Sequence, residues 1–352
     1  MTSNRNNVAD DILNVLCMVK DHPFIQKVEQ SKNNVPSIIL YSYKQMTDFN
    51  KIIGPSKEPR VGIERTFNLG NFYVTSFVYK NERVIRKDSS DHPVFLEPVF
   101  LHKEATFHNY HYFLSQISAK LASSISDIDV ILPTQIEVGS DDEKALTKAI
   151  DVVFPNSKWS LCTKHLKDNI TDYPKNKIGI NTKDRIHLID LIFGEQGILN
   201  SADTFQFEEM CSQLLTSASI PDFNNYFERT LKPKLELIYK ILRREGPNAA
   251  NRWTNNNVES INKIMKLDAN WKPHSTPALI NLLADMIKLQ QLDLHRALFS
   301  SGNYRLFGFS KKCCIREDIF RTKTPEDQNK YFVKFLNSNV SSPTPSTIGK
   351  PA

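Results

Sequence analysis

Hydrophobic and polar residues alternate with a period of two over residues 61–67. This alternation predicts a strand with one apolar face, which includes Phe67, and a more polar face carrying Gly62, Glu64 and Thr66. A turn over 68–71 separates it from a second apolar run, so the two segments predict a β-hairpin. The strands predicted after the first span 72–79 and 93–101.

Helical spacing becomes prominent further along the chain. Four-residue steps of apolar residues predict a helix over 110–121, and a stripe from Ala145 to Phe154 predicts an amphipathic one. Two more strands are predicted around it, over 130–138 with an interruption at Pro133 and over 159–162. The remaining predicted helices cover 186–192, 205–215, 226–243, a segment around Glu259, and 277–298. Before residue 60 we predict one amphipathic helix around 12–19 and a strand over 36–41.

This order of elements predicts the fold class. Three meandering strands, a helix, a strand, a helix and a strand precede a helical stretch and a final helix. We therefore predict an α/β protein with a ribonuclease-H-like mixed sheet, interrupted by an α-helical insertion and followed by a helical C-terminal extension. The expected parts are a flanking segment (1–60), the core (61–170), the insertion (171–252), core-completing helices (253–300) and a tail (301–352), with disorder from about residue 337.

Composition narrows the function classes only slightly. The 352 residues include 45 Lys and Arg against 39 Asp and Glu, a mild basic excess of +6 that is compatible with a polyanionic partner. Five cysteines without paired spacing indicate no disulfide framework, so we expect a reducing, intracellular location. We see no secretory signal and no run approaching the ~20 apolar residues of a membrane span, and so expect no membrane partner.

Three acidic residues in separate elements are the main candidates for chemistry: Glu64, Asp141 and Glu259. Carboxylates that converge from separate elements can hold Mg²⁺ on both sides of a reacting phosphate. Each also has a purely structural interpretation. Asp141 fits a capping box in which Ser140 caps the next helix, and Glu64 fits a solvent-facing strand position. Glu259 fits a surface ion pair with Lys263, because helical spacing puts both on an outward face with Asn262 and Lys266, opposite a buried stripe of Val258, Ile261, Ile264 and Met265.

Other chemical groups give weaker signals. Cys162 and His165 form a C-x-x-H pair, but a structural zinc site normally has four ligands, so a buried Cys and a hydrogen-bonded His explain the pair as well. Basic pairs occur at 164/167, 243/244 and 311/312, and each is compatible with an ordinary solvated face.

Several motifs in order resemble the Mutator-like element (MULE) transposase domain. The resemblance covers roughly residues 36–300 and includes the stretches 62–70, 72–77, 98–102, 139–150, 154–155, 161–170 and 253–262. It implies a ribonuclease-H-like core that cleaves DNA and transfers strands with two Mg²⁺ or Mn²⁺ ions. Asp141 matches the second catalytic acid, Glu259 the third, and Cys162 and His165 the family's C-x-x-H signature.

The first acid departs from the family pattern, because Glu64 stands where the family usually has Asp. The resemblance also implies DNA as the partner, a homo-oligomer on DNA and a nuclear location. We see no zinc-finger module before the core and no Cys/His-rich module after it. The alternative prediction is a catalytically inactive, transposase-derived DNA-binding or interaction protein.

Overall fold

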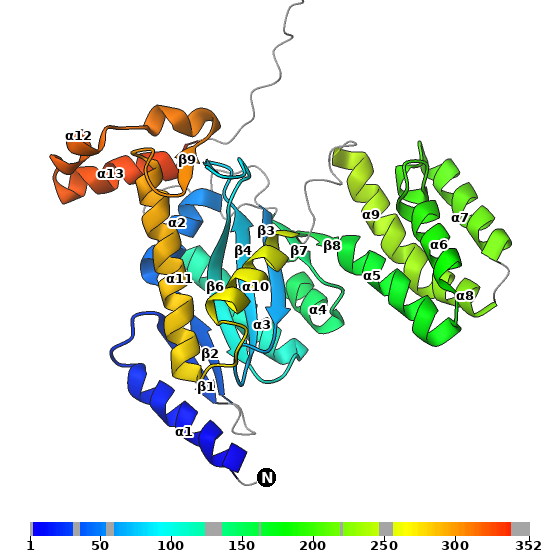
Figure 1. Cartoon of the computed structure of the whole chain (residues 1–352), viewed down its shortest axis with the longest axis horizontal. Helices are drawn as coiled ribbons and strands as arrows, with labels where there is room; N and C mark the ends of the chain where they lie inside the picture. Colours follow the sequence, from blue (N-terminus) through cyan, green and yellow to red (C-terminus); the bar gives the residue numbers. More distant parts are fainter. Residues whose placement is uncertain are drawn as a thin grey trace, which may run out of the picture. The chain divides into compact units, whose positions relative to one another are not determined.

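The structure is a computed structural model that describes residues 3–30, 36–53, 60–123, 136–161, 163–218, 221–245 and 256–338. The chain folds into two compact units. The first contains residues 1–138, 144–158 and 256–352, and the second contains 139–143 and 159–255. Each unit is described by itself below, with the elements labelled as in Figure 1.

A seven-stranded mixed sheet forms the centre of the fold, which makes this an α/β protein. The strand order across the sheet is β1-β2-β6-β4-β3-β7-β8. The strands are β1 (Ile25–Gln30), β2 (Pro36–Leu40), β3 (Arg60–Thr66), β4 (Tyr73–Lys80), β6 (Val94–His102), β7 (Glu137–Ser140) and β8 (Lys158–Leu161).

The strands predicted from alternation are confirmed, with changes at their ends. β3 and β4 form the expected antiparallel hairpin, in which Glu64 pairs with Ser76, and Ser76 in turn pairs with Val99 on β6. β7 is shorter and later than the predicted 130–138 strand, of which residues 130–135 lie outside the described ranges. β1 was not predicted. It pairs with β2, which pairs with the far side of β6.

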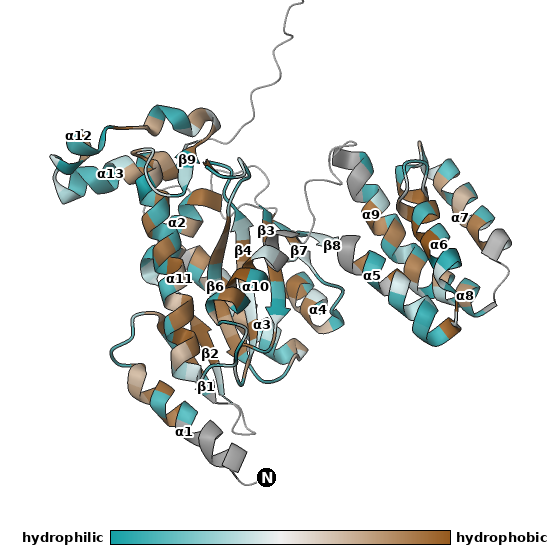
Figure 2. Ribbon diagram, in the orientation of Figure 1, coloured by the Kyte–Doolittle hydropathy of each residue, from teal (hydrophilic) through white to brown (hydrophobic). Residues whose placement is uncertain are grey.

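Helices pack on both faces of the first unit's strands. One face supports a large core that includes Val74 and Val78 of β4 and continues into α1 (Ser3–Met18), α10 (Asn256–Asp268) and α11 (Thr276–Ala297). On the other face, Phe77 and Phe100 pack their rings against Phe113 of α3 (Phe107–Ser123). Figure 2 shows the hydrophobic residues concentrated along the central strands β4 and β6. The unit also contains α2 (Tyr43–Ile53) and α4 (Lys144–Val153).

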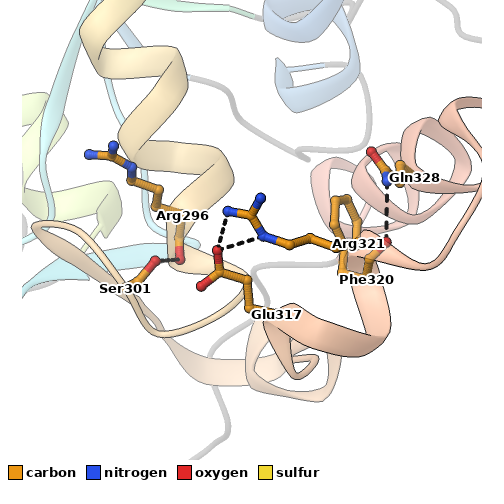
Figure 3. A network of polar contacts seen from close by, with 6 residues as sticks. All are labelled: Arg296, Ser301, Glu317, Phe320, Arg321 and Gln328. Carbon is orange, nitrogen blue, oxygen red and sulfur yellow. Dashed lines mark hydrogen bonds and ion pairs between the residues drawn. The ribbon is translucent and has the colours of Figure 1, made fainter.

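The region assigned from sequence to a tail contains ordered elements up to residue 338. Strand β9 (Tyr304–Leu306) pairs with β5 (Val84–Arg86), and a 3₁₀ helix over Gly308–Cys313 leads to α12 (Glu317–Arg321) and α13 (Pro325–Leu336). Figure 3 shows the polar contacts that hold this segment, in which Arg321 pairs with Glu317 at 2.6 Å and Gln328 donates to the Phe320 carbonyl at 3.2 Å. The disorder predicted from about 337 falls almost entirely on 339–352, outside the described residues.

The second unit is helical and has its own core. Its helices are α5 (Thr163–Tyr173), α6 (Thr182–Phe193), α7 (Thr204–Ala218), α8 (Pro221–Tyr226) and α9 (Lys232–Glu245), with π-helical turns over Pro174–Ile178 and Phe227–Leu231 and a 3₁₀ turn over Ile198–Asn200. Buried Leu166, Phe207, Phe223 and Leu235 belong to one hydrophobic cluster. The three helices predicted for the insertion are present, but the last one is divided into α8, a π-helical turn and α9.

Candidate active site

Glu64 is a buried carboxylate on the central strand β3, with only 7% of its surface exposed. Its cross-strand partner Ser76 lies on the same face as Val74 and Val78, which pack against α10. The interpretation of Glu64 as a solvent-facing residue is therefore wrong, because α10 covers the more polar face of β3. A buried carboxylate has to be compensated by cations or hydrogen bonds, so Glu64 is not at a position that serves solubility.

Helix α10 contacts β3, β4 and β6 through one side. Ile261 and Met265 are fully buried, as the helical spacing predicts. Asn262 was expected on the outward face, but only 9% of its surface is exposed, and its Oδ1 atom accepts no hydrogen bond from any described residue. The backbone of Glu259 belongs to α10, whereas its side chain lies outside the described part of the chain.

An open cavity of about 510 Å³ lies between the end of β3 and α10. The charged residues along it are Glu64, Arg65, Lys263 and Lys266, and the guanidinium of Arg65 stacks on the Tyr73 ring at 4.6 Å. The rest of the lining is formed by Thr66, Phe67, Ser260, Asn262 and Trp271. A carboxylate that shares a cavity with two lysines is suited to an anionic ligand that also carries a metal ion, such as a phosphodiester.

The oxygen donors along this cavity fit Mg²⁺ or Mn²⁺. Both ions prefer carboxylate, amide and water oxygens, and the cavity offers the Glu64 carboxylate and the Asn262 amide oxygen. Within the described residues, no group of three or more His, Cys, Asp or Glu side chains is placed to hold a metal ion.

Asp141 directly follows β7 and belongs to the second unit, together with its neighbours. The hydroxyl of Ser140 accepts a hydrogen bond from the Trp159 indole at 2.7 Å, and α4 begins only at Lys144. This register does not match a capping box with Ser140 as the N-cap residue. The next residue, Asp142, forms an ion pair with Lys234 of α9, which ties this turn to the helical unit.

The predicted site residues thus have different outcomes. Strand β3, which carries Glu64, contacts α10, which carries Glu259, and both belong to the first unit. Asp141 belongs to the second unit. The convergence of the three carboxylates on one cation stays a prediction. Cys162 and the side chain of His165 lie outside the described residues, so their role stays a prediction as well.

The exposure of the aromatic residues at the cavity was not predicted from the sequence. Phe67 was assigned to the apolar face of the strand, but it lies just beyond the end of β3 and is 54% exposed. Trp271, which follows α10, is 62% exposed. Their exposure could have been expected from their positions next to a turn. Beyond the end of a strand or helix, its hydrophobic period no longer determines which residues are buried.

The titratable groups with the most perturbed pKa values lie around a second, small cavity of about 20 Å³ in the first unit. Burial raises the pKa of Glu97 well above its usual range, and the negative charge of Asp48 adds to this effect. Burial also raises the pKa of Tyr79. The Oε2 atom of Glu97 is buried and has no hydrogen-bond partner among the described residues. This cavity is large enough for one water molecule.

Comparisons of the sequence with protein-family models and with curated proteins find no match. None of the helices in the described ranges has the length and apolar character that crossing a bilayer requires.

Proposed function

We propose that this protein is a MULE-type DNA transposase that cleaves phosphodiesters and transfers DNA strands with divalent metal ions. The observation that carries the proposal is the buried carboxylate of Glu64 in an open cavity with two lysines of α10, the helix that carries Glu259. The strand order β6-β4-β3-β7-β8 supports it. In a ribonuclease-H-like sheet, too, the three meandering strands lie side by side, and the two later strands follow next to the first strand of the meander.

The residues of the cavity have separate roles in this proposal. Glu64, with Asp141 and Glu259 by resemblance, would hold two Mg²⁺ or Mn²⁺ ions. When bound, such ions activate a water or hydroxyl nucleophile and stabilise the leaving oxygen. Lys263 and Lys266 neutralise the phosphates of the bound strand. Asn262 orients a ligand or water through its buried amide.

Glu64 provides a reason to expect weak catalysis. Its carboxylate extends one methylene further than that of Asp, and Mg²⁺ requires nearly ideal octahedral geometry. A displacement of about 1 Å can cost roughly 100-fold in rate. We expect Mn²⁺, whose geometry is more tolerant, to support more activity than Mg²⁺. The same substitution favours the second candidate function, an inactive transposase-derived DNA-binding or interaction protein.

Nicking of supercoiled plasmid by the purified full chain, in Mg²⁺ and in Mn²⁺, tests the proposal. Asp141→Asn and Glu259→Gln should each reduce nicking at least 100-fold, because each removes a charged metal ligand. Asp142→Asn is the matched control, since that neighbouring carboxylate is engaged by Lys234. Glu64→Asp should raise the rate.

Nicking that persists in Asp141→Asn would reject the assignment of the metal ligands. DNA binding without nicking in either metal, with activity restored by Glu64→Asp, would favour the inactive derivative.

The proposal also implies a homo-oligomer on DNA and a nuclear location. Sedimentation with DNA would test the first, and microscopy of the tagged full chain would test the second.

A further inference from the structure

Two exposed aromatic side chains stand at the cavity beside Glu64. Phe67 is 54% exposed and Trp271 is 62% exposed, and both line the same opening. We refer to these two residues as the aromatic rim. A single exposed ring is ordinary on a protein surface, but two rings in one charged cavity form a candidate surface for a ligand.

The backbone fixes the position of Trp271. Asn270 and Trp271 both adopt left-handed conformations, with φ of 49° and 56°, which is uncommon for a bulky residue. The Trp271 N–H donates to the Lys266 carbonyl at 2.8 Å and ends α10. Such local strain persists only where the surrounding structure determines it, and it occurs preferentially at ligand sites.

The turn between β3 and β4 holds this segment in place. The His274 N–H donates to the Leu69 carbonyl at 2.8 Å, and Gly70 forms a parallel bridge with His274. The segment that carries Trp271 is therefore attached to the turn that follows Phe67. As a result, the two rings belong to one connected structure and not to separate loose loops.

Two lysines from α10 provide positive charge beside the rim. The Lys266 ammonium lies 5.3 Å from the centre of the Phe67 ring, and Lys263 is exposed one turn earlier on the helix. Neither lysine forms an ion pair with a carboxylate among the residues that the structure describes. The cavity thus brings ring faces and ammonium groups together.

We infer that the aromatic rim binds unpaired nucleotides, with one base stacked on Trp271 and the adjoining phosphates on Lys263 and Lys266. The choice of DNA rests on the proposed function; the choice of unpaired nucleotides rests on the rim. A base within a duplex has both faces covered by its neighbours, so only an unpaired base can stack on an exposed indole. A purely apolar protein partner would leave the two lysines unpaired at the interface.

Fluorescence anisotropy of labelled DNA, with the full chain in EDTA, tests this inference apart from catalysis. The probes are a blunt duplex and the same duplex with a single-stranded extension. Trp271→Ala should weaken binding to the extended probe about 5- to 100-fold and leave the blunt duplex nearly unchanged, given the usual contribution of one stacked base. Trp271→Phe, which keeps a ring, should restore most of the loss.

A lysine pair provides a second measurement. The double variant Lys263→Ala/Lys266→Ala should weaken binding to the extension and reduce the slope of log affinity against log salt by about 1.4, the value for two contacts to a single strand. Matched controls are Phe205→Ala, an aromatic residue that is 78% exposed in the second unit, and Lys311→Ala/Lys312→Ala. Neither control should change the affinity.

Equal affinity of Trp271→Ala and the unmodified chain for the extended probe would overturn the inference, even if plasmid nicking depends on Asp141. Trp271-dependent binding without nicking in any metal would support the inference while the catalytic proposal fails. Absence of DNA binding at low salt would overturn it as well.

Discussion

Glu97 is a carboxyl group whose charge the fold disfavours. It is 5% exposed on β6, and burial followed by the charge of Asp48 raises its pKa well above the usual range. Because the folded-state pKa lies above the unfolded value, the associated stability is present at low pH and is lost as the pH rises through the folded-state pKa. Among the groups that shift the pKa of Glu97 there is no cation.

We expect Glu97→Gln to remove this pH dependence, because an amide of nearly the same shape carries no charge to bury. Thermal melting between pH 5 and pH 9 measures the effect. The two proteins should differ increasingly as the pH rises, with the variant several degrees more stable at pH 9, since 1 kcal/mol corresponds to about 2–4 °C at this size. Parallel melting curves over the whole range would contradict the expectation.

Side-chain burial was the part of the site that local sequence predicted least well. Glu64 was assigned to a more polar face, Phe67 to an apolar face and Asn262 to an exposed face, yet Glu64 and Asn262 are buried and Phe67 is exposed. In each case the outcome depends on the contact of β3 with α10, whose residues follow nearly 200 positions later in the sequence. Alternation specifies two faces of a strand, but it does not specify what covers each face.

Among the elements, the bridge between Gly70 and His274 connects the β3–β4 turn to the segment after α10. A β-carbon at Gly70 would lie 2.8 Å from the His274 carbonyl oxygen, so the two backbones would have to separate.

We expect Gly70→Ala to lower stability by about 1–3 kcal/mol, the usual cost of overpacking, and to weaken binding of unpaired DNA because Trp271 moves with the bridge. Thermal melting and the extended DNA probe measure the two effects. Asn68→Gly, in the same turn at a φ of 66°, is the control and should not lower the melting temperature. A variant at Gly70 that retains both properties would show that the bridge does not position Trp271.

An uncharged histidine of α11 packs against α13. His295 of α11 stacks on Phe332 of α13 with ring centres 3.7 Å apart, and burial, followed by the charge of Lys44, lowers its pKa to about 4. The folded-state pKa lies below the ordinary 6.5, so this contribution to stability is present above pH 6.5 and is lost as the pH falls towards 4.

Acidification from pH 7 to pH 4 should therefore loosen α13 before the remainder of the unit. Hydrogen exchange of the α13 amides measures this directly. His295→Phe, which keeps a stacked ring without a titrating group, should retain the protection of α13 at low pH. Loss of protection in both proteins at the same pH would assign the acid sensitivity to another group.

Elements with strong periodicity were predicted, and elements without it were missed. The hairpin, β6, α3 and α11 follow directly from alternation or four-residue spacing. β1, by contrast, mixes apolar and charged residues because it has a neighbour on only one side. The short α12 and α13 contain few residues of the core, so their sequences resemble a polar tail.

At the scale of the whole molecule, the order of elements predicts an α/β sheet followed by a helical part, and both are present. The sequence could not predict that residues 139–143 belong to the helical unit, because this assignment depends on contacts such as that of Asp142 with Lys234. Periodicity likewise gives no distance between Asp141 and Glu64, which belong to different units, so their convergence on one cation stays a prediction.

The position of α10 and α11 in the chain has a consequence for synthesis. These helices cover one face of the sheet, but they follow the helical unit, which extends to residue 255. A ribosome that adds about 5–20 residues per second needs on the order of ten seconds to translate that unit. During this interval that face of the nascent strands lacks α10 and α11, and we expect the emerging polypeptide to depend on chaperones until translation of its last third.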